Sequence, residues 1–409
     1  MPYIKRPIIF FVILATVVFL LILGIFSRSK TDKKIPAPVS DSPKALQAVE
    51  SYTLDALIER VKSACADTSV GCMVNTLQDF TEAYGPVPAT DALQALQRNG
   101  MIPVSEDDHQ ISHKIGRKTA EVFGVNGEAF VACPTAYNYG CQHGFFEYAL
   151  GKAESPKEAA GKICGSLGPN FSEKYGFYCY HGVGHGVLMA KAYDLQAGLA
   201  VCDTFSEFKA QDGCWQGIFM ENVNAGMRGE ARSGIFSSTD PLAPCSTVEE
   251  KYRHECFINH AGWLMKFFGN DVAQASAACL ASPGEGAGSC LESIGLMVSN
   301  PSWQGNLAPG DTGSTEEIAW KLCEKFPEGH VHDCVVGGVD NMMNFDEFKT
   351  DRAVTFCSLV SEDYRASCAE RIGFALKIQS TDAAPVVAGC TALPEALRAP
   401  CLKGAGLPT

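Results

Sequence analysis

Histidines and one glutamate between residues 109 and 185 have the spacing of ligands on a helix face. In each of the segments "HQISH", "HGFFE" and "HGVGH", two ligand-type side chains are four residues apart. Side chains four apart lie on one face of an α-helix, so each pair can hold one ion. Imidazole and carboxylate groups suit zinc and iron. We therefore predict a zinc or iron site with the ligands His143, Glu147, His181 and His185. His109 and His113 either complete this site or form a second one.

The eighteen cysteines indicate how these segments are positioned. They fall into nine consecutive pairs, and the last five pairs share the spacing C-x10-C. From Cys133 onward, successive pairs begin 31 to 44 residues apart, which is the period of a helical-hairpin solenoid. We predict one disulfide in each pair: Cys65 with Cys72, Cys133 with Cys141, Cys164 with Cys179, Cys202 with Cys214, Cys245 with Cys256, Cys279 with Cys290, Cys323 with Cys334, Cys357 with Cys368, and Cys390 with Cys401.

Each cysteine pair lies in a pattern typical of two short antiparallel helices. An apolar-rich segment ends at the first cysteine, a polar or Pro/Gly-rich connection follows, and the second cysteine opens another such segment. Such hairpins can hold two cysteines at the Cα separation of about 5.5–6 Å that a disulfide needs. Structural zinc sites use C-x2-4-C knuckles, which the sequence lacks. The predicted fold is all-α, a solenoid-like array of helical-hairpin repeats stapled by intra-hairpin disulfides and preceded by one transmembrane helix.

The repeat itself indicates that the histidines are a local feature. Two residues after the second cysteine, two adjacent repeats have His143 and His181, whereas later repeats have other side chains there, among them Gln216 and Glu292. The fold therefore does not require histidine at this position. On a helical wheel the histidines lie roughly opposite the cysteine, so we expect them to face a neighbouring repeat.

Other interpretations of the histidine cluster stay open. A polar structural cluster is one alternative, because buried histidines often bind a backbone carbonyl, and a metal-free ligand pocket is another. Two facing imidazoles are also the axial ligands of b-type haem. Arg117 and Tyr139 are further candidates to line the site, although a solvated or core-edge position is the simpler interpretation. The remaining histidines, at 254, 260, 330 and 332, are interpreted as structural or solvated.

An uncharged, apolar run of twenty residues from Pro7 to Phe26 precedes the cysteine-containing chain. At about 1.5 Å per residue it spans the hydrocarbon core of a bilayer. No clear small-x-small cleavage site follows it, so an uncleaved anchor in the lipid bilayer, residues 7–26, is favoured over a signal peptide. Disulfides form in oxidising compartments. We therefore expect a single-pass protein of the cell membrane with residues 27–409 outside the cytoplasm.

The net charge of −13 argues against nucleic acid as a partner, because an acidic surface repels phosphate. The segment 299–317 is predicted to be the longest loop of the C-terminal half. We divide the chain into the anchor 1–26, a flexible linker 27–48, an N-terminal helical pair 49–103, a histidine-rich helical region 104–200 and regular C-x10-C hairpin repeats 201–409.

This arrangement resembles the cysteine-rich Sel1-like repeat proteins, in which each α/α-hairpin carries its own disulfide. The resemblance covers the architecture of residues 49–409, although the cysteine spacing differs and the Sel1 glycine–tyrosine signature is absent. It implies a right-handed helical array used in binding. The sequence contains no known catalytic motif, so we predict a membrane-anchored metal-binding protein whose reaction is open. The alternative is a metal-free scaffold whose solenoid surface binds a partner protein.

Overall fold

The residues that the structure describes belong to one compact unit, Ala45–Thr409. The predicted anchor 1–26 and linker 27–48 lie outside the described residues. Among the helices that the structure describes, none is long and apolar enough to cross a membrane. The computed structural model describes residues 52–65, 69–102, 108–137, 139–167, 169–229, 231–232, 235–345, 349–380 and 382–409.

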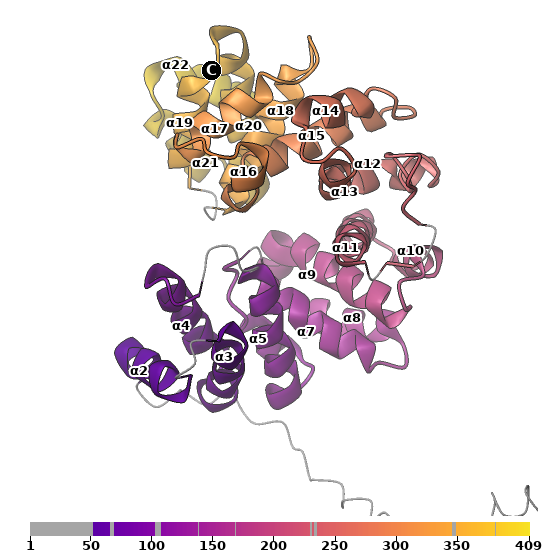
Figure 1. Ribbon diagram of the computed structural model, residues 1–409, viewed down its shortest axis with the longest axis vertical. Coiled ribbons are helices and arrows are strands. Elements are labelled where there is room, and N and C mark those ends of the chain that lie inside the picture. Colours follow the sequence, from indigo (N-terminus) through magenta and orange to yellow (C-terminus); the bar gives the residue numbers. More distant parts are fainter. Residues whose placement is uncertain are drawn as a thin grey trace, which may run out of the picture. The chain divides into compact units, whose positions relative to one another are not determined.

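Every regular element in these described residues is a helix (Figure 1), which confirms the predicted all-α class. The twenty-one helices are α2 (Leu54–Ala64), α3 (Val70–Tyr84), α4 (Pro86–Arg98), α5 (Asp108–Phe123), α6 (Gly127–Val131), α7 (Gly140–Gly151), α8 (Pro156–Cys164), α9 (Pro169–Ala190), α10 (Leu195–Cys202), α11 (Phe208–Arg228), α12 (Glu250–Ile258), α13 (Ala261–Phe267), α14 (Val272–Cys279), α15 (Gly286–Val298), α16 (Pro301–Leu307), α17 (Thr315–Cys323), α18 (Val331–Phe345), α19 (Asp351–Leu359), α20 (Glu362–Gln379), α21 (Ala383–Ala392) and α22 (Glu395–Gly404).

All eighteen cysteines form disulfides, each between consecutive cysteines, as the spacing predicted. Their Cα atoms lie 5.4 to 5.9 Å apart, which is the usual separation for this bond. The bonds join Cys65 with Cys72, Cys133 with Cys141, Cys164 with Cys179, Cys202 with Cys214, Cys245 with Cys256, Cys279 with Cys290, Cys323 with Cys334, Cys357 with Cys368, and Cys390 with Cys401.

The first cysteine ends its helix in α8, α10, α14 and α17, as expected. The second cysteine was expected to open its helix, and Cys72 does lie in the first turn of α3. In other hairpins the helix begins earlier, so that the second cysteine lies beyond its first turn. These residues are Cys179 in α9, Cys214 in α11, Cys256 in α12, Cys290 in α15, Cys368 in α20 and Cys401 in α22.

The residues before these second cysteines explain the earlier helix starts. In α11 the stretch "FKAQDG" precedes Cys214 and contains the good helix formers Lys, Ala and Gln. In α20 the stretch "EDYRAS" precedes Cys368, and its acidic residues lie in the first turn, where they interact favourably with the helix dipole. The connections of the hairpins are therefore shorter, and their second helices longer, than the cysteine positions indicated.

Two segments contain more helix than the sequence indicated. In place of the helical pair expected for 49–103, the structure has three helices, α2, α3 and α4. Gly85 separates α3 from α4 with a φ of 88°, which favours glycine, and Pro86 begins α4. The expected loop 299–317 contains α16, which begins at Pro301 and is capped by the preceding asparagine. In both places a turn signal, Gly-Pro or Asn-Pro, starts a helix.

Glycines allow helices of successive hairpins to approach closely. A Cβ atom at Gly116 of α5 would lie 1.8 Å from the backbone oxygen of Cys141 in α7, and one at Gly144 of α7 would lie 1.9 Å from that of His113 in α5. Only glycine, which has no Cβ, permits such an approach of two backbones. We call two helices joined by this reciprocal contact a tight pair. The tight pairs are α5/α7 (Gly116, Gly144), α9/α11 (Gly184, Gly217), α15/α18 (Gly295, Gly337) and α20/α22 (Gly373, Gly404).

The two tight pairs that carry the clustered histidines pack on each other through α7 and α9. A Cβ atom at Gly186 of α9 would lie 2.6 Å from the backbone oxygen of Phe146 in α7. Helices α5, α7, α9 and α11 therefore form a continuous row of closely spaced backbones (Figure 1). Side chains on the facing sides of these helices share one interior space.

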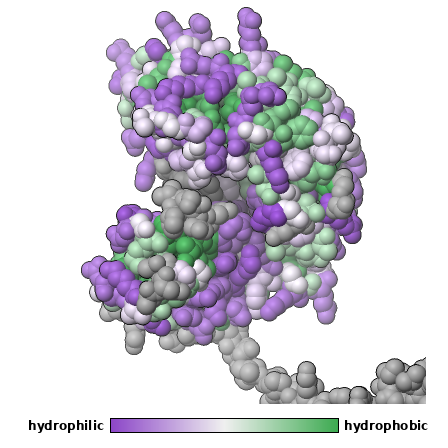
Figure 2. Space-filling view, viewed as in Figure 1, coloured by the Kyte–Doolittle hydropathy of each residue, from purple (hydrophilic) through white to green (hydrophobic). Residues whose placement is uncertain are grey.

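The interior of the molecule is mostly apolar, and the histidine region is the exception. Hydrophilic side chains are spread over the face shown in Figure 2, with apolar patches among them. The buried side chains are chiefly Leu, Ile, Val, Phe, Ala and cystine. Four buried imidazoles and two buried carboxylates nevertheless lie within the row α5–α7–α9–α11. Buried polar groups of this kind are costly unless they are bonded.

Candidate metal centre

Five imidazole rings contact one another inside the row. Helix α5 contributes His109 and His113, α7 contributes His143, and α9 contributes His181 and His185. The centroid of the His143 ring lies 5.2 and 5.5 Å from the two rings of α5, and 5.1 and 4.5 Å from the two rings of α9. The His143 ring therefore lies between two histidine pairs.

The pair on α5 is held from outside by oxygen atoms. Nδ1 of His109 lies 2.7 Å from the backbone oxygen of Tyr137, and Nδ1 of His113 lies 2.6 Å from Oε1 of Glu147. The second carboxylate oxygen accepts a hydrogen bond of 2.5 Å from Nε of Arg117. The two Nε2 atoms of the pair face each other at 2.9 Å.

The pair on α9 has the same arrangement with different partners. Nδ1 of His181 lies 3.0 Å from the amide oxygen of Gln216, and Nδ1 of His185 lies 3.1 Å from Oε2 of Glu221. Nη2 of Arg228 donates to the other oxygen of Glu221 at 3.1 Å. The two Nε2 atoms again face each other, at 3.2 Å.

The tautomers of these four rings follow from their oxygen partners. Since an oxygen accepts at each Nδ1, each Nδ1 carries the proton, and Nε2 of the neutral ring carries a lone pair. When both rings of a pair are neutral, two lone pairs face each other, an arrangement that a cation between them stabilises. Adjacent nitrogens bound at about 2.1 Å lie about 3.4 Å apart on a tetrahedral ion and about 3.0 Å apart on an octahedral one. The observed separations of 2.9 and 3.2 Å match those of metal ligands.

His143 is the ring with unused nitrogens. It is 3% exposed, and among the described residues neither Nδ1 nor Nε2 has a hydrogen-bond partner. A buried polar atom without a partner costs about 1–3 kcal/mol. One donor atom each from His109, His113 and His143 lie within 4.8 Å of one another, and so do donor atoms from His143, His181 and His185. The histidine clusters could hold a metal ion.

The protonation states suit metal binding. Burial lowers the pKa of His109 to about 3 and the pKa values of His143 and His181 well below 6.5, so these rings are neutral at pH 7. Burial raises the pKa of Glu147, but the adjacent His113 and Arg117 outweigh this effect and lower it to about 2. The carboxylate is therefore charged and able to hold the N–H of His113.

The structure brings all six predicted side chains together. Glu147 contacts the outer nitrogen of His113 and does not face the other imidazoles. Its two oxygens are occupied by His113 and Arg117, so it orients a ring from outside. Arg117 thus belongs to the cluster. Tyr139 instead stacks on Tyr178, with ring centroids 4.3 Å apart.

Sequence reasoning missed the outer partners of the α9 pair, Gln216, Glu221 and Arg228. Glu221 lies in the apolar-rich segment "FMENV", where it is only 1% exposed and also accepts a hydrogen bond from Tyr193. Its signal was an acid within an apolar helix, seven residues after Cys214.

The other histidines bind nearby groups. His254 contacts Ser289, His260 contacts the backbone oxygen of Pro241, and His330 contacts Asp333. These contacts fit the structural or solvated interpretation. Haem is disfavoured at the cluster, because rings with centroids 4.5–5.5 Å apart leave too little space between them for a porphyrin.

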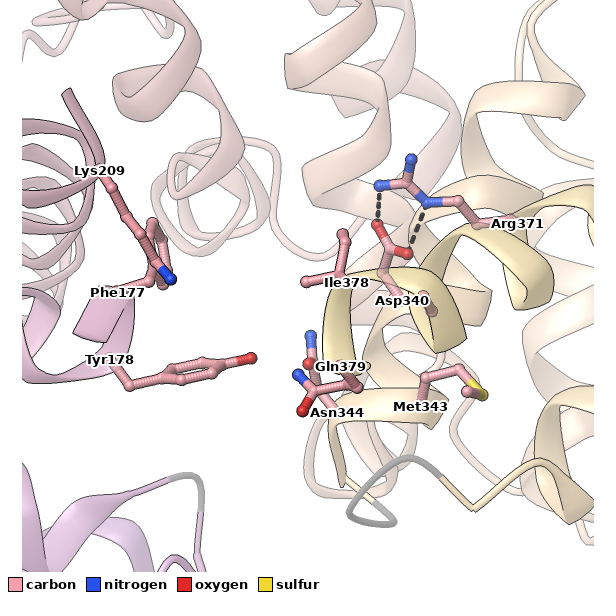
Figure 3. A pocket seen from close by; sticks show the side chains of 10 residues that line it. Phe177, Tyr178, Lys209, Asp340, Met343, Asn344, Arg371, Ile378 and Gln379 are labelled. Atoms are coloured by element: carbon pink, nitrogen blue, oxygen red, sulfur yellow. Dashed lines mark hydrogen bonds and ion pairs between the residues drawn. The ribbon is translucent and has the colours of Figure 1, made fainter. Parts of the chain in front are cut away.

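A cavity of about 310 Å³ lies near the cluster (Figure 3). Phe177, Tyr178 and Lys209 of α9 and α11 face residues of α18 and α20 across it, including the ion pair between Asp340 and Arg371. The Phe177 ring is one helical turn before His181, and their centroids are 6.3 Å apart. Phe177 therefore lines the cavity and also contacts the ring of His181.

Comparisons with protein-family models, with curated proteins and with solved structures found no match for the chain. The structure fits a cysteine-rich helical repeat, and the likeness to Sel1-like proteins stays a resemblance in architecture.

Proposed function

We propose that the chain is a metalloprotein whose clustered imidazoles on α5, α7 and α9 hold a transition metal, zinc or iron being the ions such ligands suit. One observation supports this most strongly. Four Nε2 atoms face each other two by two, beside a buried His143 whose nitrogens find no hydrogen-bond partner in the described part of the chain. A hydrogen-bonded structural cluster would give the two nitrogens of this buried ring partners.

The outer partners support the same function. In metal sites, a ligating histidine usually donates its other N–H to a carboxylate or a carbonyl, which fixes its tautomer and orientation. Glu147 and Glu221 do this for His113 and His185, and each carboxylate is held in turn by an arginine. These contacts direct Nε2 toward the shared interior space.

The donor count favours an ion that retains a free coordination position. Each set of donors within 4.8 Å contains three imidazoles. A zinc ion with three protein ligands binds water at its fourth position and lowers the pKa of that water to about 7. The proposed chemistry is therefore Lewis-acid activation of water or of a small substrate.

The proposed location is an oxidising compartment. Nine disulfides support this part of the proposal, because disulfides persist outside the reducing cytoplasm. The apolar run 7–26 would hold the chain at the membrane, with residues 27–409 on the oxidising side.

Elemental analysis tests the metal proposal. The full chain, expressed with export and purified in detergent, should contain zinc or iron in a fixed ratio to protein. The His143→Ala variant should lose most of it. His332→Ala is the matched control, because its side chain is 50% exposed and far from any donor set in sequence, and it should retain the metal. Protein without metal after reloading with either ion, or equal loss in both variants, would contradict the proposal.

A further inference from the structure

We infer that the centre holds two metal ions and that His143 bridges them as an imidazolate, with one nitrogen on each ion. This inference rests on the proposed metal function and adds the number of ions and the role of one residue. Its first support is the grouping of the donor atoms. They form two sets of three that share only His143. One set is His109, His113 and His143, and the other is His143, His181 and His185.

A single ion does not account for this grouping. Two nitrogens on opposite sides of one ion, each bound at about 2.1 Å, are about 4.2 Å apart. Five imidazoles on one ion would therefore form one compact set. The observed sets instead follow the helices: one contains both histidines of α5, and the other contains both histidines of α9.

The nitrogens of His143 decide between the arrangements. The other four rings each use Nδ1 to bind an oxygen and have one nitrogen left for a metal. Within the described residues, His143 has neither nitrogen engaged and is 3% exposed. One ion would use a single nitrogen of this ring and leave the other buried without a partner. Two ions use both.

The histidine pairs of α5 and α9 also have equivalent hydrogen-bond and ion-pair partners. Behind the α5 pair lies Glu147 of the next helix, bonded to Arg117. Behind the α9 pair lies Glu221 of the next helix, bonded to Arg228. Each half thus has two imidazoles on one helix, a carboxylate from its tight-pair partner and an arginine. Two equivalent outer shells match two ions, and each carboxylate offsets part of the positive charge of one ion.

Binding the second ion removes the N–H proton of the His143 ring. The neutral ring has one N–H, and this proton must pass to water before the second nitrogen can bind a metal. No electron is transferred in this step. The product is one ring with two metal–nitrogen bonds, and each ion keeps two further imidazoles from its own helix.

Cu²⁺ is a suitable probe, since imidazole binds it strongly and electron paramagnetic resonance reports whether two Cu²⁺ ions are coupled. The full chain is stripped with a chelator, loaded with Cu²⁺ alone and desalted. Elemental analysis should give two copper ions per chain. An imidazolate bridge couples their spins, so the integrated resonance signal should be far weaker than that of two isolated ions.

Variants identify the two halves. The double variant His181→Ala/His185→Ala should bind one copper ion and show its full, uncoupled signal. The control His332→Ala should keep two ions and the weak signal. Circular dichroism checks that each variant is folded, and the measurement on the unaltered chain does not depend on a variant.

The outcomes separate the two proposals. Two ions with a coupled signal support the bridge. One copper ion per chain, or two ions with a full uncoupled signal, overturns the bridge and leaves the metal function standing. A chain that binds no copper, zinc or iron overturns both.

Discussion

Because α5 and α7 form a tight pair, we expect that one methyl group added at Gly144 will lower both stability and metal binding. In Gly144→Ala, the new Cβ atom would lie 1.9 Å from the backbone oxygen of His113, whereas ordinary contact begins at 3.4 Å. The backbones of the two helices must therefore separate by about 1.5 Å. A backbone oxygen cannot avoid the clash by changing rotamer, so the whole helix must move.

The magnitude follows from this displacement. Overpacking of a well-filled interior typically costs about 1–3 kcal/mol, and a clash with backbone belongs at the upper end, about 3 kcal/mol. The same movement carries His113 away from His143. Metal–ligand distances tolerate only about 0.2 Å, so the set of donors that contains both residues should lose its ion.

Two matched glycine variants distinguish a direct effect on the metal site from an effect of lower overall stability. Gly373→Ala would place its Cβ 1.8 Å from the backbone oxygen of Cys401, in the tight pair α20/α22, which has none of the five clustered histidines. It should lose similar stability but keep its metal. Gly151→Ala is on α7, with nothing within 4 Å of the added Cβ among the described residues. It should keep its metal and have equal or up to about 1 kcal/mol greater stability.

The assays are urea unfolding of the metal-free chain and elemental analysis of the loaded chain. Wild-type stability and metal content in Gly144→Ala would refute the close helix approach. Loss of metal from Gly373→Ala as well would show that the metal responds to overall stability, and that the contact between α5 and α7 has no special role.

Three other features have measurable consequences. Burial lowers the pKa of His260 to about 4. The unfolded chain therefore binds a proton between about pH 6.5 and pH 4 that the folded chain does not, and the free energy of unfolding should fall by about 3 kcal/mol as pH drops through this window. Urea titrations should show a smaller fall in His260→Gln, and an equal fall would contradict this reasoning. Replacing Cys202 and Cys214 together by serine should lower the free energy of unfolding by about 2–3 kcal/mol, and an unchanged urea midpoint would count against it. Arg371→Leu leaves the half-buried carboxylate of Asp340 without its ion-pair partner and should cost about 2 kcal/mol. Adding Asp340→Asn should recover part of that loss, whereas a further equal loss would speak against the pair.

The fold class and the disulfides could be predicted because each disulfide joins cysteines that are close together in the sequence. A pair such as Cys323 and Cys334 is joined within one hairpin, so its partner is the next cysteine in the chain. The i,i+4 spacing on α5 and α9 is equally local. It was sufficient to select His109, His113, His181 and His185, whose Nε2 atoms the structure brings together in pairs.

The residues that bind Nδ1 of the histidines depend on how different hairpins pack. A local sequence pattern does not predict this packing. Glu221 reaches His185 because α9 and α11 form a tight pair through Gly184 and Gly217. The sequence shows these glycines but not which helix each one meets. For the same reason, sequence reasoning assigned Glu147 as a ligand, whereas in the structure it binds Nδ1 of His113.

The bridges also bear on how the molecule can mature. Every cysteine bonds to its neighbour in order of appearance, across separations of 7 to 15 residues. During synthesis, which begins at the N-terminus, each disulfide can therefore form before the next hairpin has been made. No later exchange of cysteine partners is needed. Imidazoles from three successive units come together when these hairpins dock on one another. If the proposed metal centre exists, disulfide formation and metal binding can therefore occur as separate stages.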